Sequence, residues 1–311
     1  MSTNFPDVSI NRTLHTAFEG INHLIIIQNN NGEKKFVSQF FHTDKIFNKT
    51  LIQRLEILSS LDHPNISKIN KYYSNKLIRN NNIRPFLGNI HFEIMMDYII
   101  EEITLDNYIN NCSGPIIGDS LVTMFTQIVT GINYIHKRNL IHNNIYSKII
   151  LKYHPNTPIN TDAGFGGDIK IICGTNIERY FNEDMNFLAE NNLLYTNKNN
   201  LYTPNLLNEE FIFSSKCMDK NHEIIYVSPE ETYGDIIDFK SDIYLLGLTL
   251  FKMSCSYDPH IDSKGNLSDA RDHYSFVSPQ IIKIINKCTK KNKMERYKNC
   301  EELLDDLNKI K

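Results

Sequence analysis

The sequence predicts an α+β fold in two parts: a small β-rich amino-terminal lobe with one helix and a larger, mostly helical carboxy-terminal lobe. Two observations predict it. Short β-type runs dominate residues 15–98, and apolar residues at helical spacing dominate the rest of the chain. The length of 311 residues, 41% of them hydrophobic, allows a sizeable core in one large domain or in two lobes.

The first lobe is expected to open with a β-hairpin. Two short apolar runs, LIIIQ (24–28) and KFVSQFF (35–41), are separated by NNNGEK, whose Asn-Gly step is typical of a hairpin turn. Leucines at helical spacing predict a helix over 46–61, which Pro64 ends. A further apolar run over 90–99 indicates a buried strand that leads into the second lobe.

The second lobe is expected to hold four main helices. Residues 120–139 place apolar side chains on one helical face, and residues 240–253 are apolar nearly all round, as in a helix buried on every side. VSPQIIKIINKC and CEELLDDLNKI predict two more helices near the end of the chain. The Asn-rich stretch over 182–222 shows no convincing periodicity, and no internal repeat is apparent.

Charge and cysteine usage limit the classes of partner. The net charge of −3 argues against a nucleic-acid or membrane-surface partner. The start of the chain lacks the features of a signal peptide, and no apolar run is long enough for a membrane span. The cysteines lack metal-ligand spacing and predict reduced thiols of an intracellular protein, cytoplasmic or nuclear. They are Cys112, Cys173, Cys217, Cys255, Cys288 and Cys300.

A series of short strings follows one order along the chain. These are LDHPNI (61–66), IMMDYI (94–99), LIHNNIYSKIIL (140–151), YVSPEE (226–231) and SDIYLLG (241–247). Together they resemble the eukaryotic protein kinase superfamily, over essentially the whole chain. The resemblance implies a single kinase-like domain over 1–311, with one lobe at about 14–97, the other at 98–311 and a long activation-like segment at about 173–230.

Residues whose role in that family is structural are present. The A-P-E motif corresponds to Ser228-Pro229-Glu230, and the resemblance implies that Glu230 pairs with Arg296. The structural motif residues are His142, Pro229, Glu230, Asp242, Gly247 and Arg296.

The nucleotide pocket implied by the resemblance is vestigial. Its phosphate-covering loop retains one glycine, and neutral Gln39 stands where the family has a lysine that balances phosphate charge. Arg54 stands at the position of that lysine's glutamate partner, and Glu56 is turned away from it by about 200°. The pocket residues are Gly20, Gln39, Met96 as gatekeeper, Asp97 and Tyr98.

The catalytic loop also departs from the family pattern H-R-D-L-x-x-x-N. Asn144 replaces the aspartate and cannot accept a substrate proton as a carboxylate would. Tyr146 and Ile149 replace the lysine and asparagine that contact phosphate and metal. Cys173 stands at the metal-binding aspartate of D-F-G, and a thiol is a poor ligand for Mg²⁺.

Other groups could substitute for the missing ones. Lys34 and Lys35 could supply phosphate charge from another strand position, although surface lysines on a hairpin are the favoured interpretation. Asp162 and Asp168 flank the loop GFGG (164–167) and are interpreted as solvated turn carboxylates. In the activation-like segment, the apolar cluster over 211–213 is expected to pack rather than remain in water.

Catalytic positions are lost while structural positions are kept. This contrast predicts a pseudokinase that is not an enzyme, has no cofactor or metal, and acts as a scaffold, allosteric regulator or protein-interaction module. Its partner would be a protein, such as an active kinase or another signalling protein. Two alternatives stay open: an atypical serine/threonine-type protein kinase with rerouted ATP- and metal-binding residues, and a nucleotide-binding sensor without phosphotransfer. Weak, metal-independent binding of ATP also stays open.

Overall fold

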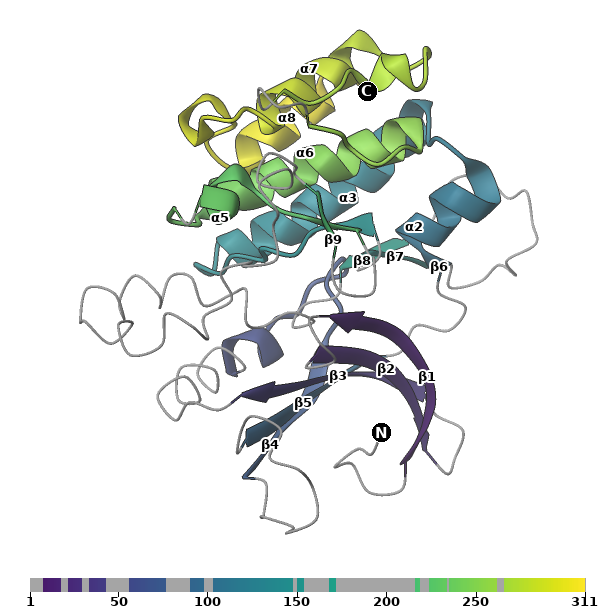
Figure 1. The fold of residues 1–311 in the computed structure, drawn as a ribbon, viewed down its shortest axis with the longest axis vertical. Helices are drawn as coiled ribbons and strands as arrows, with labels where there is room; N and C mark the ends of the chain where they lie inside the picture. The colour runs from purple at the N-terminus through teal and green to yellow at the C-terminus, as the bar shows by residue number, and fades with distance from the viewer. Residues whose placement is uncertain are drawn as a thin grey trace. The chain divides into compact units, whose positions relative to one another are not determined.

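A computed structural model describes most of the predicted elements. The described residues are 8–17, 22–29, 34–42, 56–76, 90–97, 103–147, 150–153, 168–171, 216–218, 224–233, 235–261 and 266–310. The chain divides into two compact units (Figure 1). One unit comprises Met1–Ile100, Ile172–Ile177 and Asp219–Asn221, and the other comprises Glu101–Ile171, Glu178–Met218 and His222–Lys311.

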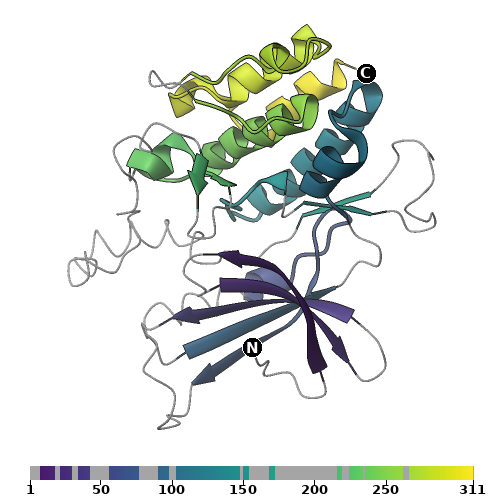
Figure 2. The same cartoon turned by 45° about the vertical axis from the view of Figure 1, so that its right-hand side comes forward.

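The first unit is built on a five-stranded antiparallel sheet with the order β1-β2-β3-β5-β4 (Figure 2). Its strands are β1 (Val8–Ala17), β2 (Asn22–Asn29), β3 (Lys34–His42), β4 (Ile69–Lys76) and β5 (Ile90–Asp97). The predicted hairpin is confirmed, because β2 pairs with β3 and Gln28 lies opposite Lys34. Strand β1 was not predicted from the sequence. Two register shifts interrupt its pairing with β2, and such irregularities break the alternation that identifies a strand.

The predicted helix of this unit is described only at its end, over residues 56–59. Leu58, Leu61 and Ile66 are buried, with 3%, 1% and 2% of their surface exposed. The Ile66 N–H donates to the His63 carbonyl at 3.0 Å, so the chain turns at the predicted position around Pro64. The rest of the prediction, residues 46–55, lies outside the described residues.

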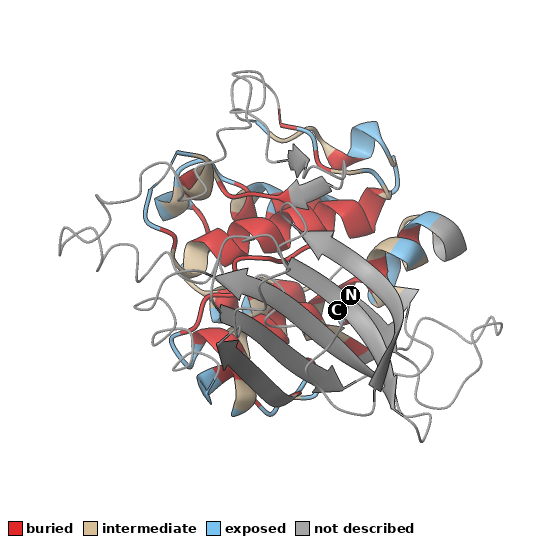
Figure 3. Ribbon diagram, turned by 60° about the horizontal axis from the view of Figure 1, so that its bottom comes forward, coloured by how far each residue is buried: buried red, intermediate tan, exposed pale blue. Residues whose placement is uncertain are grey.

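The second unit contains the four predicted helices. They are α3 (Gly118–His136), α6 (Phe239–Cys255), α7 (Pro279–Cys288) and α8 (Cys300–Asn308). Helix α6 is buried along its length from Ser241 to Cys255, as its apolar sequence predicts (Figure 3). None of the helices that the structure describes has both the length and the apolar character that a membrane span requires.

Shorter elements complete this unit. They are β6 (Ile103–Thr104), α2 (Leu105–Asn107), π-helix η1 (Tyr108–Ser113), β7 (Ile150–Tyr153), β8 (Asp168–Ile171), β9 (Lys216–Met218), β10 (Ile224–Tyr226), α5 (Pro229–Tyr233), and the 3₁₀ turns η5 (Ala270–Asp272) and η6 (Lys293–Glu295). Strands β6, β7 and β8 form a three-stranded sheet, while β9 and β10 form an antiparallel pair.

Two details differ from the sequence analysis. Asp168 is the first residue of strand β8 and lies opposite Tyr153, so its interpretation as a turn residue is wrong. The activation-like segment contains β9 and β10, although its sequence shows no periodicity. Both strands are three residues long, which is too short to display an alternating pattern.

Gly247 allows helices α6 and α7 to approach closely. A Cβ atom at this position would lie 2.5 Å from Cys288 Cβ and 2.7 Å from Thr289 Cγ2. Such distances are shorter than real carbon–carbon contacts, so the packing requires a residue without a side chain.

Candidate functional site

The loop of residues 140–147, which contains His142 and Asn144, connects α3 to β7 and is buried throughout. It is attached to the core by Asp242, in the first turn of α6. The His142 N–H donates to Asp242 Oδ2 at 2.7 Å, and the Asn143 N–H donates to Asp242 Oδ1 at 2.6 Å. Because both carboxylate oxygens are used, one side chain fixes the backbone of two successive loop residues.

The start of α6 holds Asp242 in place. Asp238 caps the helix by accepting from Lys240 N at 2.8 Å, and the Ser241 hydroxyl accepts from Asp238 N at 3.3 Å. This reciprocal arrangement is a capping box, and the positive end of the helix dipole favours a carboxylate in the first turn. The sequence therefore positions Asp242 by local helix chemistry.

A third group, His136 at the end of α3, completes the surroundings of Asp242. Its Nε2 atom lies 2.7 Å from Asp242 Oδ2, and its Nδ1 atom lies 3.5 Å from Cys300 Sγ. Burial raises the pKa of the Cys300 thiol well above its ordinary value, so the thiol keeps its proton. An S–H group that donates to Nδ1 leaves the ring hydrogen on Nε2, where it can be donated to Asp242.

Sequence reasoning missed His136. It lies 106 residues from Asp242, and no local pattern links positions so far apart. The ring also packs against Phe239, with ring centroids 4.7 Å apart. The loop is therefore fixed from both α3 and α6.

Asn143 gives the loop an unusual backbone conformation, with φ of 48°. This left-handed region is strained for most side chains, and asparagine is among the residues that tolerate it best. Asn139, at the entrance to the loop, also adopts this left-handed conformation, with φ of 56°. The two asparagines therefore serve the turn geometry.

Asn144 and Tyr146, the replacements for the family's aspartate and lysine, are both buried, each with 3% of its surface exposed. The Tyr146 ring meets the Tyr226 ring edge-on, with centroids 6.4 Å apart. The amide of Asn144 can donate and accept hydrogen bonds but is not a proton acceptor at neutral pH. This part of the loop thus offers hydrogen bonds rather than charge.

Ser147 connects the end of the loop to α2 and η1. Its hydroxyl donates to Asp106 Oδ1 at 2.8 Å, and Asn110 Nδ2 donates to Asp106 Oδ2 at 3.1 Å. Asp106 is therefore a carboxylate bonded directly to the loop, and sequence reasoning missed it.

The same network continues to the end of α6. Lys252 Nζ donates to Asn110 Oδ1 at 3.0 Å and lies 3.5 Å from Asp258 Oδ1. The Tyr226 hydroxyl donates to the same Asp258 oxygen at 3.5 Å. Burial, reinforced by Asp258 and then Asp106, raises the pKa of Tyr226 well above its ordinary value, so Tyr226 remains a neutral donor.

Glu230 and Arg296 form the ion pair that the sequence analysis expected. Arg296 Nη1 donates to Glu230 Oε1 at 2.6 Å, and Nη2 donates to Oε2 at 2.8 Å. The remaining guanidinium N–H groups donate to backbone carbonyls, so all five donors are used. Those carbonyls belong to Lys240, Lys290 and Lys291.

The structure describes only some of the expected nucleotide-pocket residues. Gln39 lies on β3 opposite Glu93, while Met96 and Asp97 end β5 opposite Phe36 and Lys35. Several predicted positions lie outside the described residues. They are Gly20, Arg54, Tyr98, Ile149, Asp162, Cys173 and the cluster over 211–213.

Clustered carboxylates would be the sign of a magnesium site among the described residues. Mg²⁺ prefers an octahedral set of oxygen ligands that usually includes carboxylates. In the described ranges, no three His, Cys, Asp or Glu side chains converge on one point.

Comparison with known proteins identifies relatives. Residues 34–170 match the family model described as protein tyrosine and serine/threonine kinase. The chain is 25% identical over 278 residues to the serine/threonine-protein kinase PrkC of Bacillus subtilis, covering 86% of the chain and 34% of PrkC. It is 22% identical over 287 residues to a probable serine/threonine-protein kinase PknB of Lactococcus lactis, covering 88% of the chain and 36% of that protein. The chain thus spans about a third of the length of these relatives.

Solved kinase structures share the fold. The PknI kinase domain of Mycobacterium tuberculosis matches 99% of the chain and 98% of its own length, with a TM-score of 0.61 and 13% identity. Rad53 1–466 in complex with AMP-PNP matches 96% of the chain and 64% of its own length, with a TM-score of 0.63 and 14% identity.

The relatives overturn one prediction. The chain was expected not to be an enzyme, but the relatives that match most of it are named serine/threonine-protein kinases. The physical reason for the error is that phosphoryl transfer depends on positioning and on charge spread over several groups. A list of substituted positions therefore does not by itself decide activity. Nothing in the comparisons supports a scaffold or allosteric role.

The fold prediction is confirmed, because solved kinase domains match nearly the whole chain. The family model independently matches the segment from β3 to β8. Together, the family model over residues 34–170 and the fold shared with solved kinase domains support a place for the chain in the protein kinase superfamily.

Proposed function

We propose that the chain is an atypical serine/threonine-type protein kinase that uses a rerouted set of residues. The observation that carries the proposal is the double hydrogen bond from the His142 and Asn143 backbone to Asp242, which holds the catalytic loop. The relatives named serine/threonine-protein kinases support the same activity.

A positioned loop supplies a large part of what this reaction needs. The transferred phosphoryl group passes through a loose transition state, so little covalent chemistry remains for the protein. Holding the acceptor hydroxyl in line with the phosphorus atom removes much of the entropic barrier. The loop is held by Asp242 at one end and by Asp106 at Ser147, so it can serve as such a platform.

Asn144 would orient the acceptor rather than deprotonate it. Its amide oxygen can accept a hydrogen bond from a serine or threonine hydroxyl. The hydroxyl oxygen then bonds to the terminal phosphorus of a nucleoside triphosphate, the bond to the leaving diphosphate breaks, and the hydroxyl proton passes to solvent. General-base catalysis typically contributes about 10²–10⁴-fold, so the rate should be lower than with an aspartate by about that factor.

Charge for the phosphates would come from other positions. Lys35 lies on β3 four residues from Gln39, and the register with β5 is unbroken between them. An even spacing places two positions on the same face of a sheet, so Lys35 is a candidate substitute, whereas Lys34 belongs to the opposite face. Asp168, the first residue of β8, is a candidate carboxylate.

Incubation of the purified chain with labelled ATP, Mg²⁺ or Mn²⁺ and mixed protein substrates tests the proposal. Phosphoserine and phosphothreonine identified by mass spectrometry are the expected products. Lys35→Ala and Asp168→Asn should each reduce incorporation, while Lys34→Ala, the matched control, should not. Incorporation at background level with both metals, in protein with an intact melting transition, would reject the proposal.

An intracellular location, cytoplasmic or nuclear, belongs to the same proposal. Three cysteines of the described residues, Cys255, Cys288 and Cys300, are free and buried. Reduced thiols fit a reducing compartment.

A further inference from the structure

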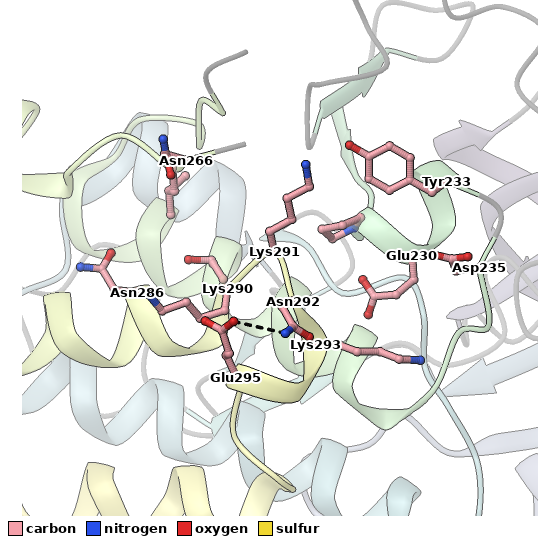
Figure 4. A pocket seen from close by; sticks show the side chains of 13 residues that line it. Glu230, Tyr233, Asp235, Asn266, Asn286, Lys290, Lys291, Asn292, Lys293 and Glu295 are labelled. Atoms are coloured by element: carbon pink, nitrogen blue, oxygen red, sulfur yellow. Dashed lines mark hydrogen bonds between the residues drawn. The ribbon is translucent and has the colours of Figure 1, made fainter. Parts of the chain in front are cut away.

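A pocket of about 840 Å³ lies in the second unit, and no residue of the loop 140–147 lines it (Figure 4). Its lining comes from helix α5, the end of α7, the connecting residues 289–292 and the η6 turn, together with Asp235 and residues 266–267. Its volume is within the range of ligand-binding sites. Its lining is polar, with three lysines, three asparagines and three carboxylates among the described residues.

The pocket lies within the most basic part of the described chain. Residues 283–298 contain seven cationic residues and one carboxylate, Glu295. Three of these cations are bound to carboxylates: Arg296 to Glu230, Lys293 to Asp238 and Lys287 to Glu302. Lys290 and Lys291 line the pocket and form no ion pair with any carboxylate of the described residues.

The backbone under these two lysines is fixed. Arg296 Nε donates to the Lys290 carbonyl at 2.7 Å, and Nη2 donates to the Lys291 carbonyl at 3.2 Å. The buried pair with Glu230 fixes Arg296 itself. Both lysines are exposed, so two adjacent cations stand on a rigid base, which lowers the entropic cost of binding an anion.

The three carboxylates of the lining differ in their surroundings, and Glu230 is already bound to Arg296. Figure 4 shows Asp235 beyond Glu230, on the opposite side of the pocket from Lys290. Glu295 accepts a hydrogen bond from Asn292 Nδ2 at 3.2 Å. Asn286, exposed on the last turn of α7, adds an amide donor and acceptor beside Lys290.

An apolar surface adjoins the cations. Tyr233 lines the pocket with 48% of its surface exposed, and Lys291 Nζ lies 5.5 Å from the centre of its ring. Figure 4 shows the Lys291 side chain rising between Tyr233 and Asn266. Ile236 and Met294, 58% and 73% exposed, flank the lining. A mixed surface of this kind complements a ligand that carries both negative charge and an apolar anchor.

We propose that this pocket binds an acidic peptide segment with an aromatic anchor, contributed by a protein partner. Carboxylates of the segment would contact Lys290 and Lys291, and its anchor would pack on Tyr233. The proposal rests on the proposed function in one respect: the segment would belong to a protein substrate, and the pocket would be the docking site for that substrate. Binding itself requires neither nucleotide nor phosphotransfer.

Fluorescence anisotropy with a labelled peptide of Glu and Gly residues around one Phe tests the proposal. The double variant Lys290→Glu/Lys291→Glu should weaken binding by at least about tenfold. The matched control Lys283→Glu/Lys298→Glu changes two exposed lysines of the same basic run that do not line the pocket, and should change affinity much less. Tyr233→Ala should weaken binding of this peptide but not of a peptide with Gly in place of Phe.

Three results would overturn the proposal: no binding by the unaltered chain, equal losses in both double variants, or binding to phosphatidylserine vesicles without binding to the peptide. Equal losses would indicate unspecific charge attraction, and vesicle binding alone would indicate a membrane surface. Because no nucleotide is present, the result is independent of the phosphotransfer assay. Melting temperatures of all variants show whether each remains folded.

Discussion

Glu230 and Arg296 lie 66 residues apart and form two parallel hydrogen bonds of 2.6 and 2.8 Å, with their side chains 5% and 0% exposed. The carboxylate also accepts from the Ser241 hydroxyl at 3.1 Å. The guanidinium donates to the carbonyls of the pocket lysines, Lys290 and Lys291, and to that of Lys240 at the start of α6. This pair therefore fixes three segments of the second unit at one point.

Removal of either partner should be costly. Arg296→Ala leaves a buried carboxylate without its cation, and we expect a loss of about 3–5 kcal/mol in the free energy of unfolding. Arg296→Lys retains the charge but cannot form the paired bonds. Its free energy of unfolding should therefore lie between those of the unaltered chain and of Arg296→Ala. Urea denaturation measures both. Lys298→Ala, at an exposed neighbour, is the control, and an Arg296→Ala loss no larger than that control would contradict the role.

Gly247 provides a test of helix packing. Gly247→Ala would place Cβ 2.5 Å from Cys288 Cβ, and overpacking of a close-packed core costs about 1–3 kcal/mol. This should exceed the gain in helix propensity, which is about 1 kcal/mol at most. Ser254→Ala, on the same buried helix, is the comparison. A melting temperature equal to or above that of the unaltered chain would show that α7 can move away without cost.

Long apolar patterns predicted α3, α6, α7 and α8 because each helix buries a continuous face or surface. The Glu230–Arg296 pair could be expected from the resemblance. The bonds that fix the loop could not be predicted from local patterns. His136 reaches Asp242 across 106 residues, and Ser147 reaches Asp106 across 41. Such contacts follow from packing of whole elements and leave no local signal.

Lys287 and Glu302 provide a test of pH dependence. The side-chain hydrogen bond from Lys287, at 2.6 Å, together with the Lys298 N–H, lowers the pKa of Glu302 from its ordinary value of 4.5. A depressed pKa in the folded state stabilises the fold above pH 4.5, and this contribution is lost as pH falls through the folded-state pKa. Both side chains are partly exposed, so the effect should be at most about 1 kcal/mol.

Glu302→Gln should therefore destabilise the chain at neutral pH and have little effect well below pH 4.5. Urea unfolding of both proteins at the two pH values measures the difference. Glu301→Gln, at an exposed neighbour whose ion pair with Lys137 is also on the surface, is the control. A difference between Glu302→Gln and the unaltered chain that is the same at both pH values would contradict the assignment.

Asn144 links the loop geometry to the proposed activity. Asn144→Asp restores a carboxylate to a backbone that Asp242 already holds through His142 and Asn143. If the acceptor hydroxyl lies at Asn144, the new base should raise phosphotransfer by about tenfold or more, since general bases contribute about 10²–10⁴-fold. The substitution buries a charge at a site that is 3% exposed, so a lower melting temperature is expected.

Asn139→Asp is the matched control, because it makes the same chemical change at an exposed position of the loop entrance. A rate that is unchanged in folded Asn144→Asp, or raised equally by Asn139→Asp, would place the reacting hydroxyl elsewhere. A selective rise would show that the loop positions the acceptor and lacks only the base.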